Sequence, residues 1–228
     1  MKNGDWGLGT RGWGFGIILA IVGGGLSGFA KESAESDTDK NLTITLHVYD
    51  YAQVEEKELA RARDEVSWVL ERVGIEANWL NCPVPGMERQ NAQECRSTAG
   101  ALVLRILPRA MAERAARDKG SLGFAQLADD GEPTYEVSVF YHRVERLSVE
   151  LRCARGVILG YALAHEIGHL LLGTNSHALN GIMRAHWTEE ELRLASAGRF
   201  TFLPQQAAKM RAEVRQRFLP PRQTASRK

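Results

Sequence analysis

The spacing of hydrophobic and polar residues changes several times after residue 40, and each change marks an expected element. Residues 41–51 alternate β-branched and polar side chains, which is typical of a half-buried strand. Residues 52–74 repeat apolar positions at helical spacing until Gly74, which ends the pattern. Residues 75–81 and 101–108 return to strand character. The first half of the chain therefore predicts a strand, a helix and two further strands.

The second half predicts a hairpin followed by helices. The expected elements, in chain order, are a short helix at 109–117, hairpin strands at 121–128 and 134–144 around the turn sequence DDGEP, a long helix at 148–172, and helices at 188–198 and 204–219. No internal repeat or interdomain linker interrupts this order. The alternation predicts one mixed α/β or α+β domain over residues 42–218, with a sheet that packs against the first helix and the long helix, and α+β is the class that we expect.

The two ends of the chain differ in composition from this domain. Lys2 and Arg11 precede an uncharged run from Gly12 to Ala30, which is typical of a secretory signal peptide cleaved after Ala30. The run is also long enough for an uncleaved membrane anchor, so both alternatives stay open for residues 1–30. Residues 31–41 are expected to be a flexible leader and residues 219–228 a flexible basic tail. We therefore expect a secreted or otherwise extracytoplasmic protein.

Composition excludes some partners. The chain has 228 residues, of which 44% are hydrophobic, and a formal net charge of +1, as expected for a globular domain. No basic stripe is interleaved with aromatic residues, so nucleic acid is not an expected partner. We expect a monomer that contacts a membrane only if its N-terminal segment is uncleaved.

The three cysteines allow one disulfide and one free thiol. Cys82 and Cys95 flank a polar, turn-rich segment, so a local disulfide between them is the first expectation. Cys153 lies on the apolar pattern of the long helix and is expected to be a buried free thiol. A pairing of Cys95 with Cys153 remains an alternative on sequence grounds.

The long helix carries ionisable residues in an apolar setting. From residue 157 to residue 172 it reads VILGYALAHEIGHLLL, apolar nearly all round, so His165, Glu166 and His169 are expected to be buried. An unpaired buried carboxylate is costly, and no Lys or Arg lies between Arg155 and Arg184. A divalent cation would satisfy all three groups. The alternative is a pair of core histidines that are satisfied by backbone carbonyls.

The spacing of these residues favours a zinc site. His165 and His169 are four residues apart and so share one helical face, from which both imidazoles can bind one zinc ion. Glu166 lies beside that face, where it can act as a general base, as in the His-Glu-x-x-His signature of zinc hydrolases. Gly173 can end the helix in a sharp turn that brings His177 to the ion as a third ligand.

This segment resembles the metzincin clan of zinc peptidases, whose pattern is His-Glu-x-x-His-x-x-Gly-x-x-His followed by a methionine turn. Six residues match in order and kind, although the loop is two residues longer: His165, Glu166, His169, Gly173, His177 and Met183. The chain is also similar to an uncharacterised group of secreted bacterial metzincin-like proteins. The resemblance implies a metzincin-like domain with a twisted mixed sheet, a backing helix, a zinc helix and C-terminal helices. It further implies that Met183 supports the site and that residues 121–128 bind an extended peptide. The alternative for residues 121–128 is an ordinary edge strand without a ligand.

Several assignments have rivals. Glu189 is a rival third ligand because another zincin class uses a glutamate about twenty residues past the second histidine, although a glutamate there also suits a helix N-terminus. Arg184 or His186 could assist catalysis as an oxyanion donor, although a solvent-facing or structural role is the favoured alternative. The expected function is a secreted zinc metalloendopeptidase that acts on peptide or protein substrates. The alternative is a non-catalytic, zinc-stabilised peptide-binding protein, against which a buried Glu166 argues.

Overall fold

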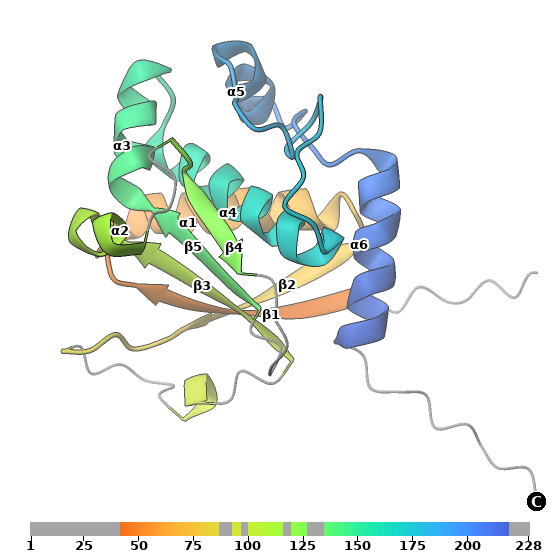
Figure 1. Cartoon of the computed structure of the whole chain (residues 1–228), viewed down its shortest axis with the longest axis horizontal. Helices are drawn as coiled ribbons and strands as arrows, with labels where there is room; N and C mark the ends of the chain where they lie inside the picture. Colours follow the sequence, from red (N-terminus) through yellow and green to blue (C-terminus); the bar gives the residue numbers. More distant parts are fainter. Residues whose placement is uncertain (1–41, 87–92, 97–99, 116–119, 127–134, 219–228) are drawn as a thin grey trace, which may run out of the picture. The chain divides into compact units, whose positions relative to one another are not determined.

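The computed structural model describes residues 42–86, 93–96, 100–115, 120–126 and 135–218, all of which lie in one compact unit (Figure 1). The elements of these residues, in chain order, are β1 (Leu42–Asp50), α1 (Glu56–Glu71), β2 (Ile75–Asn81), the 3-10 turn η1 (Glu94–Arg96), β3 (Ala101–Leu107), α2 (Arg109–Ala115), β4 (Gly123–Gln126), β5 (Glu136–Phe140), α3 (Tyr141–Glu150), α4 (Arg155–Leu172), α5 (Glu189–Ser196) and α6 (Pro204–Arg217). The expected signal peptide or anchor, leader and basic tail lie outside the described residues.

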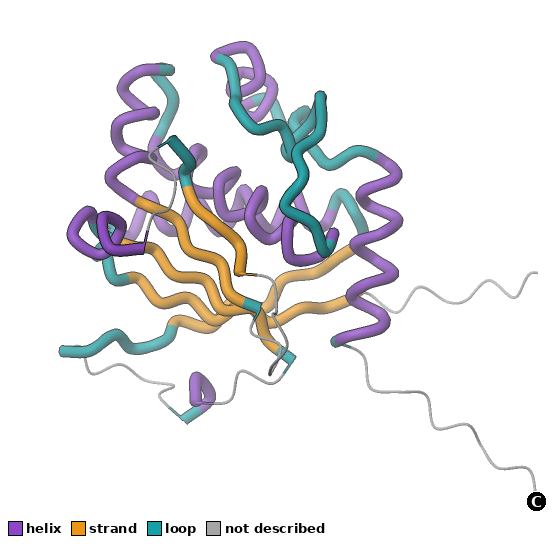
Figure 2. The backbone as a smooth tube through the Cα atoms, viewed as in Figure 1, coloured by secondary structure: helices purple, strands orange, loops and turns teal. Residues whose placement is uncertain are grey.

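The described strands form one mixed sheet in the order β2-β1-β3-β5-β4 (Figure 2). β1 pairs in parallel with β2 and β3, and β3 pairs in parallel with β5. β4 runs antiparallel to β5 and forms the edge of the sheet. The prediction of a mixed sheet with an antiparallel strand pair is therefore confirmed, and the sheet is mostly parallel. The DDGEP turn lies outside the described residues.

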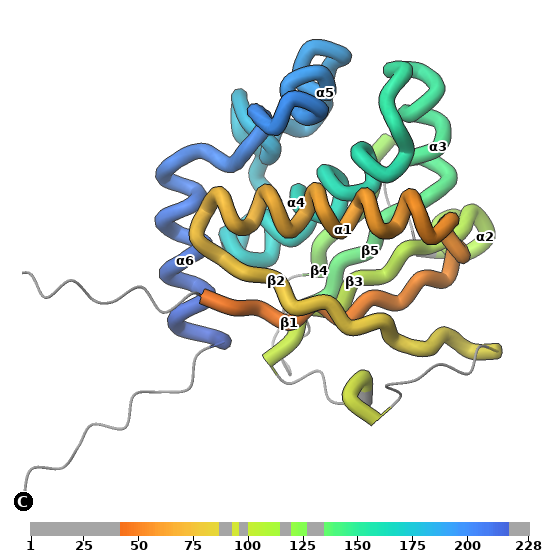
Figure 3. Tube along the Cα trace, turned by 180° about the vertical axis from the view of Figure 1, so that it is seen from behind, coloured from red at the N-terminus to blue at the C-terminus, as the bar shows by residue number. Residues whose placement is uncertain are grey.

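Two helices cover one face of the sheet and form the core with it (Figure 3). Alternate residues of β1 point toward these helices and are buried: Leu42, Ile44, Leu46 and Val48. α1 and α4 approach each other closely at Gly160, where an added Cβ would lie 2.6 Å from the Cβ of Glu65 and 2.8 Å from the carbonyl of Ala62. The predicted backing helix and histidine-bearing helix therefore pack together on the sheet.

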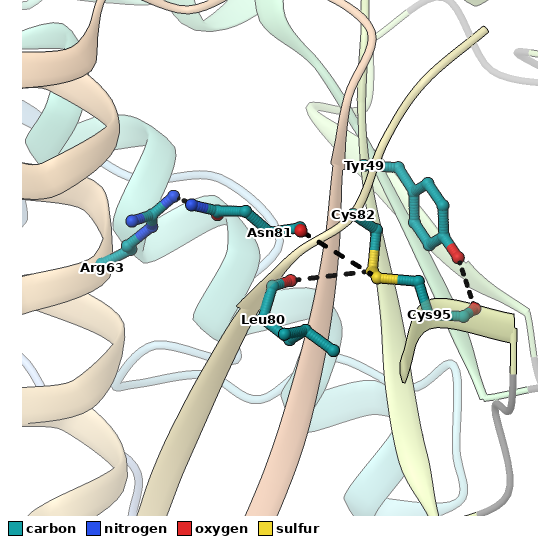
Figure 4. Close-up of a disulfide and its surroundings, with 6 residues drawn as sticks. All are labelled: Tyr49, Arg63, Leu80, Asn81, Cys82 and Cys95. Carbon is teal, nitrogen blue, oxygen red and sulfur yellow. Dashed lines mark hydrogen bonds between the residues drawn. A yellow bond between two sulfur atoms is a disulfide. The ribbon is translucent and has the colours of Figure 1, made fainter. Parts of the chain in front are cut away.

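The opposite face of the sheet carries the disulfide (Figure 4). Cys82, at the end of β2, is bonded to Cys95 in η1 with a Cα–Cα distance of 5.7 Å. The Tyr49 hydroxyl donates to the carbonyl of Cys95 at 3.1 Å and so fixes η1 against β1. The local pairing of Cys82 with Cys95 is confirmed, and Cys153 is free.

Two predicted boundaries were wrong. The helix expected over 148–172 is divided into α3 and α4, and the strand expected over 134–144 ends at Phe140, where α3 begins. Arg152 adopts a left-handed backbone conformation (φ 50°) between the two helices. The Ser148 hydroxyl donates to the carbonyl of Cys153 at 2.6 Å and stabilises the break. Cys153 therefore lies between the helices and is half-buried.

The C-terminal helices follow the prediction closely. α5 begins with a capping box in which Thr188 and Glu191 satisfy each other's backbone N–H groups. α6 begins at Pro204, a residue suited to the first helical turn, and buries Met210 and Val214. Within the described residues, no helix combines the length and the apolar character that a membrane span requires.

Candidate metal centre

The C-terminal half of α4 places three ionisable residues in the interior. His165, Glu166 and His169 are each at most 7% exposed. They are held there because α4 is apolar on nearly every side and is buried from Gly156 to Leu172. The burial predicted from the sequence is confirmed.

A tight loop after α4 brings the third histidine to the first two. Gly173 ends the helix in the left-handed conformation (φ 59°), which glycine adopts without steric cost. The N–H of Ala178 then donates to the carbonyl of Met183 at 2.7 Å and closes the loop that follows His177. One ligand nitrogen from each of His165, His169 and His177 lies within 4.8 Å of the other two. The segment from His169 to His177 is two residues longer than in the metzincin pattern, yet the three imidazoles still lie together.

Backbone carbonyls orient the two buried imidazoles. Nδ1 of His165 lies 2.8 Å from the carbonyl of Ile182, and Nδ1 of His169 lies 2.8 Å from the carbonyl of Thr174. A carbonyl only accepts hydrogen bonds, so each Nδ1 carries the proton and donates it. Burial lowers the pKa of His165 to about 4 and also lowers the pKa of His169, so both rings are neutral at pH 7. Each Nε2 is therefore unprotonated and has a lone pair available to bind a metal ion.

The two bare nitrogens face each other, and this favours a bound cation. Nε2 of His165 and Nε2 of His169 are 3.1 Å apart. Without a proton or metal ion between them, their lone pairs repel. Two nitrogens bound to one tetrahedral zinc at about 2.0–2.1 Å would lie about 3.3 Å apart. The observed separation fits that arrangement, whereas backbone carbonyls satisfy only the Nδ1 side of each ring.

Glu166 lies beside this cluster, under the edge strand β4. An added Cβ on Gly123 would lie 3.1 Å from Oε1 of Glu166 and 2.4 Å from the carbonyl of Ser138, so only glycine fits at this position. Burial raises the pKa of Glu166 to about 8 and is its sole cause among the described residues. A dication nearby would favour the ionised carboxylate.

Met183 packs against α4 below the histidines. It is fully buried, and an added Cβ on Gly168 would lie 2.4 Å from the Met183 sulfur and 2.7 Å from the ring of Phe202. Gly168 therefore allows the methionine to reach the helix between its two histidines. The supporting role of Met183 stays a prediction.

Three other residues considered from the sequence lie outside the cluster. Glu189 is exposed at the start of α5 and does not belong to the histidine group found among the described residues. Arg184 forms an ion pair with Glu191 at 2.8 Å, which directs its guanidinium toward α5. His186 is exposed. Among the described residues, neither Glu189 nor His186 belongs to the group of side chains that could hold a metal ion together.

Sequence reasoning missed the groups that orient the ligands. The carbonyls of Ile182 and Thr174 have no signature in the sequence, because the direction of a backbone group depends on the fold of its loop. Trp187, whose ring lies 5.8 Å from that of His165 between centroids, was also missed. Its only signal was a tryptophan close to the methionine turn.

Three solved structures resemble the fold at low similarity. They are archaemetzincin from Methanopyrus kandleri (14% identity, TM-score 0.45, 77% of this chain and 98% of that one), metalloproteinase-II from Bacteroides fragilis (12%, 0.47, 76% and 54%) and a zinc-dependent peptidase from Methanocorpusculum labreanum (16%, 0.46, 72% and 99%). No protein-family model and no curated protein matches the sequence. Likeness at this level carries no conclusion about function, which has to come from the side chains of the site.

Proposed function

We propose that this protein is an exported, zinc-dependent metallopeptidase that cleaves extended peptide or protein substrates. The observation that carries the proposal is that the unprotonated Nε2 atoms of His165 and His169 lie 3.1 Å apart. A ligand nitrogen of His177 lies within 4.8 Å of theirs, and the buried carboxyl group of Glu166 is beside them. These imidazoles are the expected zinc ligands. Zinc, when bound, supplies Lewis-acid chemistry by promoting deprotonation of a water molecule and polarising the scissile carbonyl.

Glu166 is the expected general base and acid. Its carboxylate accepts a proton from the attacking water and later donates it to the leaving amine. Its position supports this role: Glu166 is buried on α4 directly after His165, and a zinc ion held by the histidines would favour its ionised form.

The edge of β4 that faces away from β5 is the expected docking site for the substrate. The N–H of Phe140 donates to the carbonyl of Leu122 at 2.8 Å, so Leu122 and, by antiparallel alternation, Phe124 direct their backbone groups toward β5. Gly123 and Ala125 then direct theirs away from the sheet, where an extended peptide can add as a further strand. Gly123 also lies against Glu166, so a docked peptide would pass close to the base.

Export and the expected partners belong to the same proposal. The disulfide between Cys82 and Cys95 suits an oxidising, extracytoplasmic compartment. The expected partner is a peptide or protein substrate that binds a monomer, and no nucleic acid is expected.

The test compares the wild-type chain with Glu166→Gln. Zinc content is measured after purification and again after chelation and zinc addition, and cleavage is measured on a library of extended peptides. The glutamine has nearly the same shape but cannot act as a base, so the variant should retain zinc and lose hydrolysis. Full turnover in the variant would contradict the assignment of Glu166. A wild-type chain that binds zinc and peptides without cleaving them would favour the binding-protein alternative.

A further inference from the structure

Arg143 is a buried cation outside the histidine site. It lies in the first turn of α3 and is only 7% exposed. Its guanidinium donates to the backbone carbonyl of Ser121 and lies 3.5 Å from the Ser121 hydroxyl. Ser121 comes two residues before β4, so this contact joins α3 to the start of the edge strand.

A second contact joins Arg143 to β4 through aromatic rings. The guanidinium lies 4.6 Å above the centroid of the Phe140 ring, and Phe140 is fully buried. The Phe140 ring in turn lies 5.9 Å from the ring of Phe124, which belongs to β4. Arg143 therefore reaches the strand directly at Ser121 and indirectly at Phe124, with the cation over the face of an aromatic ring.

β4 depends on such contacts because of its position. It has four residues, and among the strands that the structure describes it pairs only with β5. A short edge strand with few partners is among the first parts of a sheet to open. Its residue Gly123 contacts Glu166, so any shift of the strand changes the distance between the peptide-docking edge and the base.

We propose that Arg143 is a positioning residue that holds β4 in register with Glu166 and thereby sets the affinity for extended peptides. The inference rests on the proposed peptidase function. The contacts that carry the proposal are those of Arg143 with Ser121 and Phe140, beside β4. The effect of Arg143 acts through the backbone of β4.

The experiment compares Arg143→Met and Arg143→Lys with the control Arg146→Met, an exposed arginine one turn further along α3. Two substrates are used: an extended peptide that spans β4 and a blocked dipeptide too short to pair along it. For the extended peptide, Arg143→Met should raise KM about tenfold or more, because hydrogen bonds to charged groups are strong. Activity on the dipeptide and zinc content should stay at wild-type levels. Arg143→Lys should restore part of the affinity, since lysine can still donate to the Ser121 carbonyl.

Hydrogen exchange of the β4 amides provides a readout that does not depend on catalysis. Exchange at Phe124 and Gln126, whose amides face β5, should be faster in Arg143→Met and unchanged in Arg146→Met. Equal loss of activity on both substrates, or unchanged exchange in β4, would overturn the proposal. If Arg143→Met does not fold, the same comparisons on Arg143→Lys decide the question. A wild-type chain that cleaves neither substrate refutes the peptidase function, and hydrogen exchange then still decides whether Arg143 anchors β4.

Discussion

Trp187 and His165 donate to the same backbone oxygen. Nε1 of Trp187 lies 3.1 Å from the carbonyl of Ile182, and Nδ1 of His165 lies 2.8 Å from it. The two rings also meet edge to face. Trp187 therefore holds in place the peptide group that orients a predicted metal ligand, as groups behind metal ligands commonly do.

Replacing Trp187 with phenylalanine should weaken zinc binding without removing a ligand. The ring packing is largely kept, but the Ile182 carbonyl loses the donor that fixes it, so His165 is held less firmly. We expect zinc affinity to fall about tenfold, which is the low end for changes behind a metal ligand. Competition with a chromophoric chelator measures this directly.

Trp79→Phe provides the matched control. Trp79 is also half-buried and donates through Nε1, but to the hydroxyl of Ser67 at 2.9 Å, and it lies on β2, at the opposite edge of the sheet from β4. This variant should keep wild-type zinc affinity. A similar loss of affinity in both variants would show that general stability, and not the Ile182 carbonyl, is responsible.

The raised pKa of Glu166 predicts a specific pH dependence for the metal-free chain. Burial moves this pKa from its ordinary value of 4.5 to about 8. Between these values the unfolded chain has lost the proton and the folded chain keeps it, so Glu166 makes the free energy of unfolding fall as pH rises. The loss begins near pH 4.5 and is complete once the folded carboxyl group ionises near pH 8.

Comparison with Glu166→Gln isolates this effect, because glutamine does not titrate and the lowered pKa of His165 is common to both chains. In the presence of a chelator, the Tm of the variant should rise relative to wild type from pH 4.5 to 8 and then level off. A Tm difference that stays constant across this range would mean that Glu166 is not buried as an uncharged acid in the metal-free chain.

The disulfide should contribute to stability but not to zinc binding. Cys82 and Cys95 are 13 residues apart, and closing a loop of that length stabilises a fold by about 3 kcal/mol in the chain-entropy account. Cys82→Ser with Cys95→Ser should therefore lower the Tm measurably. Zinc content should stay unchanged, because the bond lies on the sheet face opposite α4. Cys153→Ser removes only the free thiol, so reducing agents should lower the Tm of this variant by the same amount as that of wild type.

Local spacing explains which parts of the site could be predicted from the sequence. His165, Glu166 and His169 lie on one helix, where spacing alone determines which side chains share a face. His177 follows within a loop whose glycine marks the turn. Gly123 could not be assigned a role, because its contact with Glu166 joins residues that are distant in the sequence and meet only through the sheet.

For the fold, too, features that depend on neighbouring residues could be predicted, whereas features that depend on particular side-chain contacts could not. Strand and helix periods predicted most elements and the antiparallel strand pair, because each depends on neighbouring residues. The break between α3 and α4 was missed because no proline or glycine marks it. Arg152 adopts a conformation that is rare for residues other than glycine, and contacts between Ser148 and Cys153 stabilise it.

The final prediction is that His177, and not Glu189, is the third zinc ligand. Both residues are exposed, so replacing either with alanine should cost the metal-free fold little, and a change in zinc binding then reports coordination. His177 has a ligand nitrogen within 4.8 Å of those of His165 and His169, whereas Glu189 lies in the first turn of α5, where a negative charge suits the helix dipole. His177→Ala should lower zinc affinity more than about 100-fold, since changes behind a ligand alone cost 10–100-fold. Glu189→Ala should keep its zinc when both variants are measured at the same pH. The reverse result would assign the third ligand position to a carboxylate, and the ligand set would then no longer resemble that of metzincins.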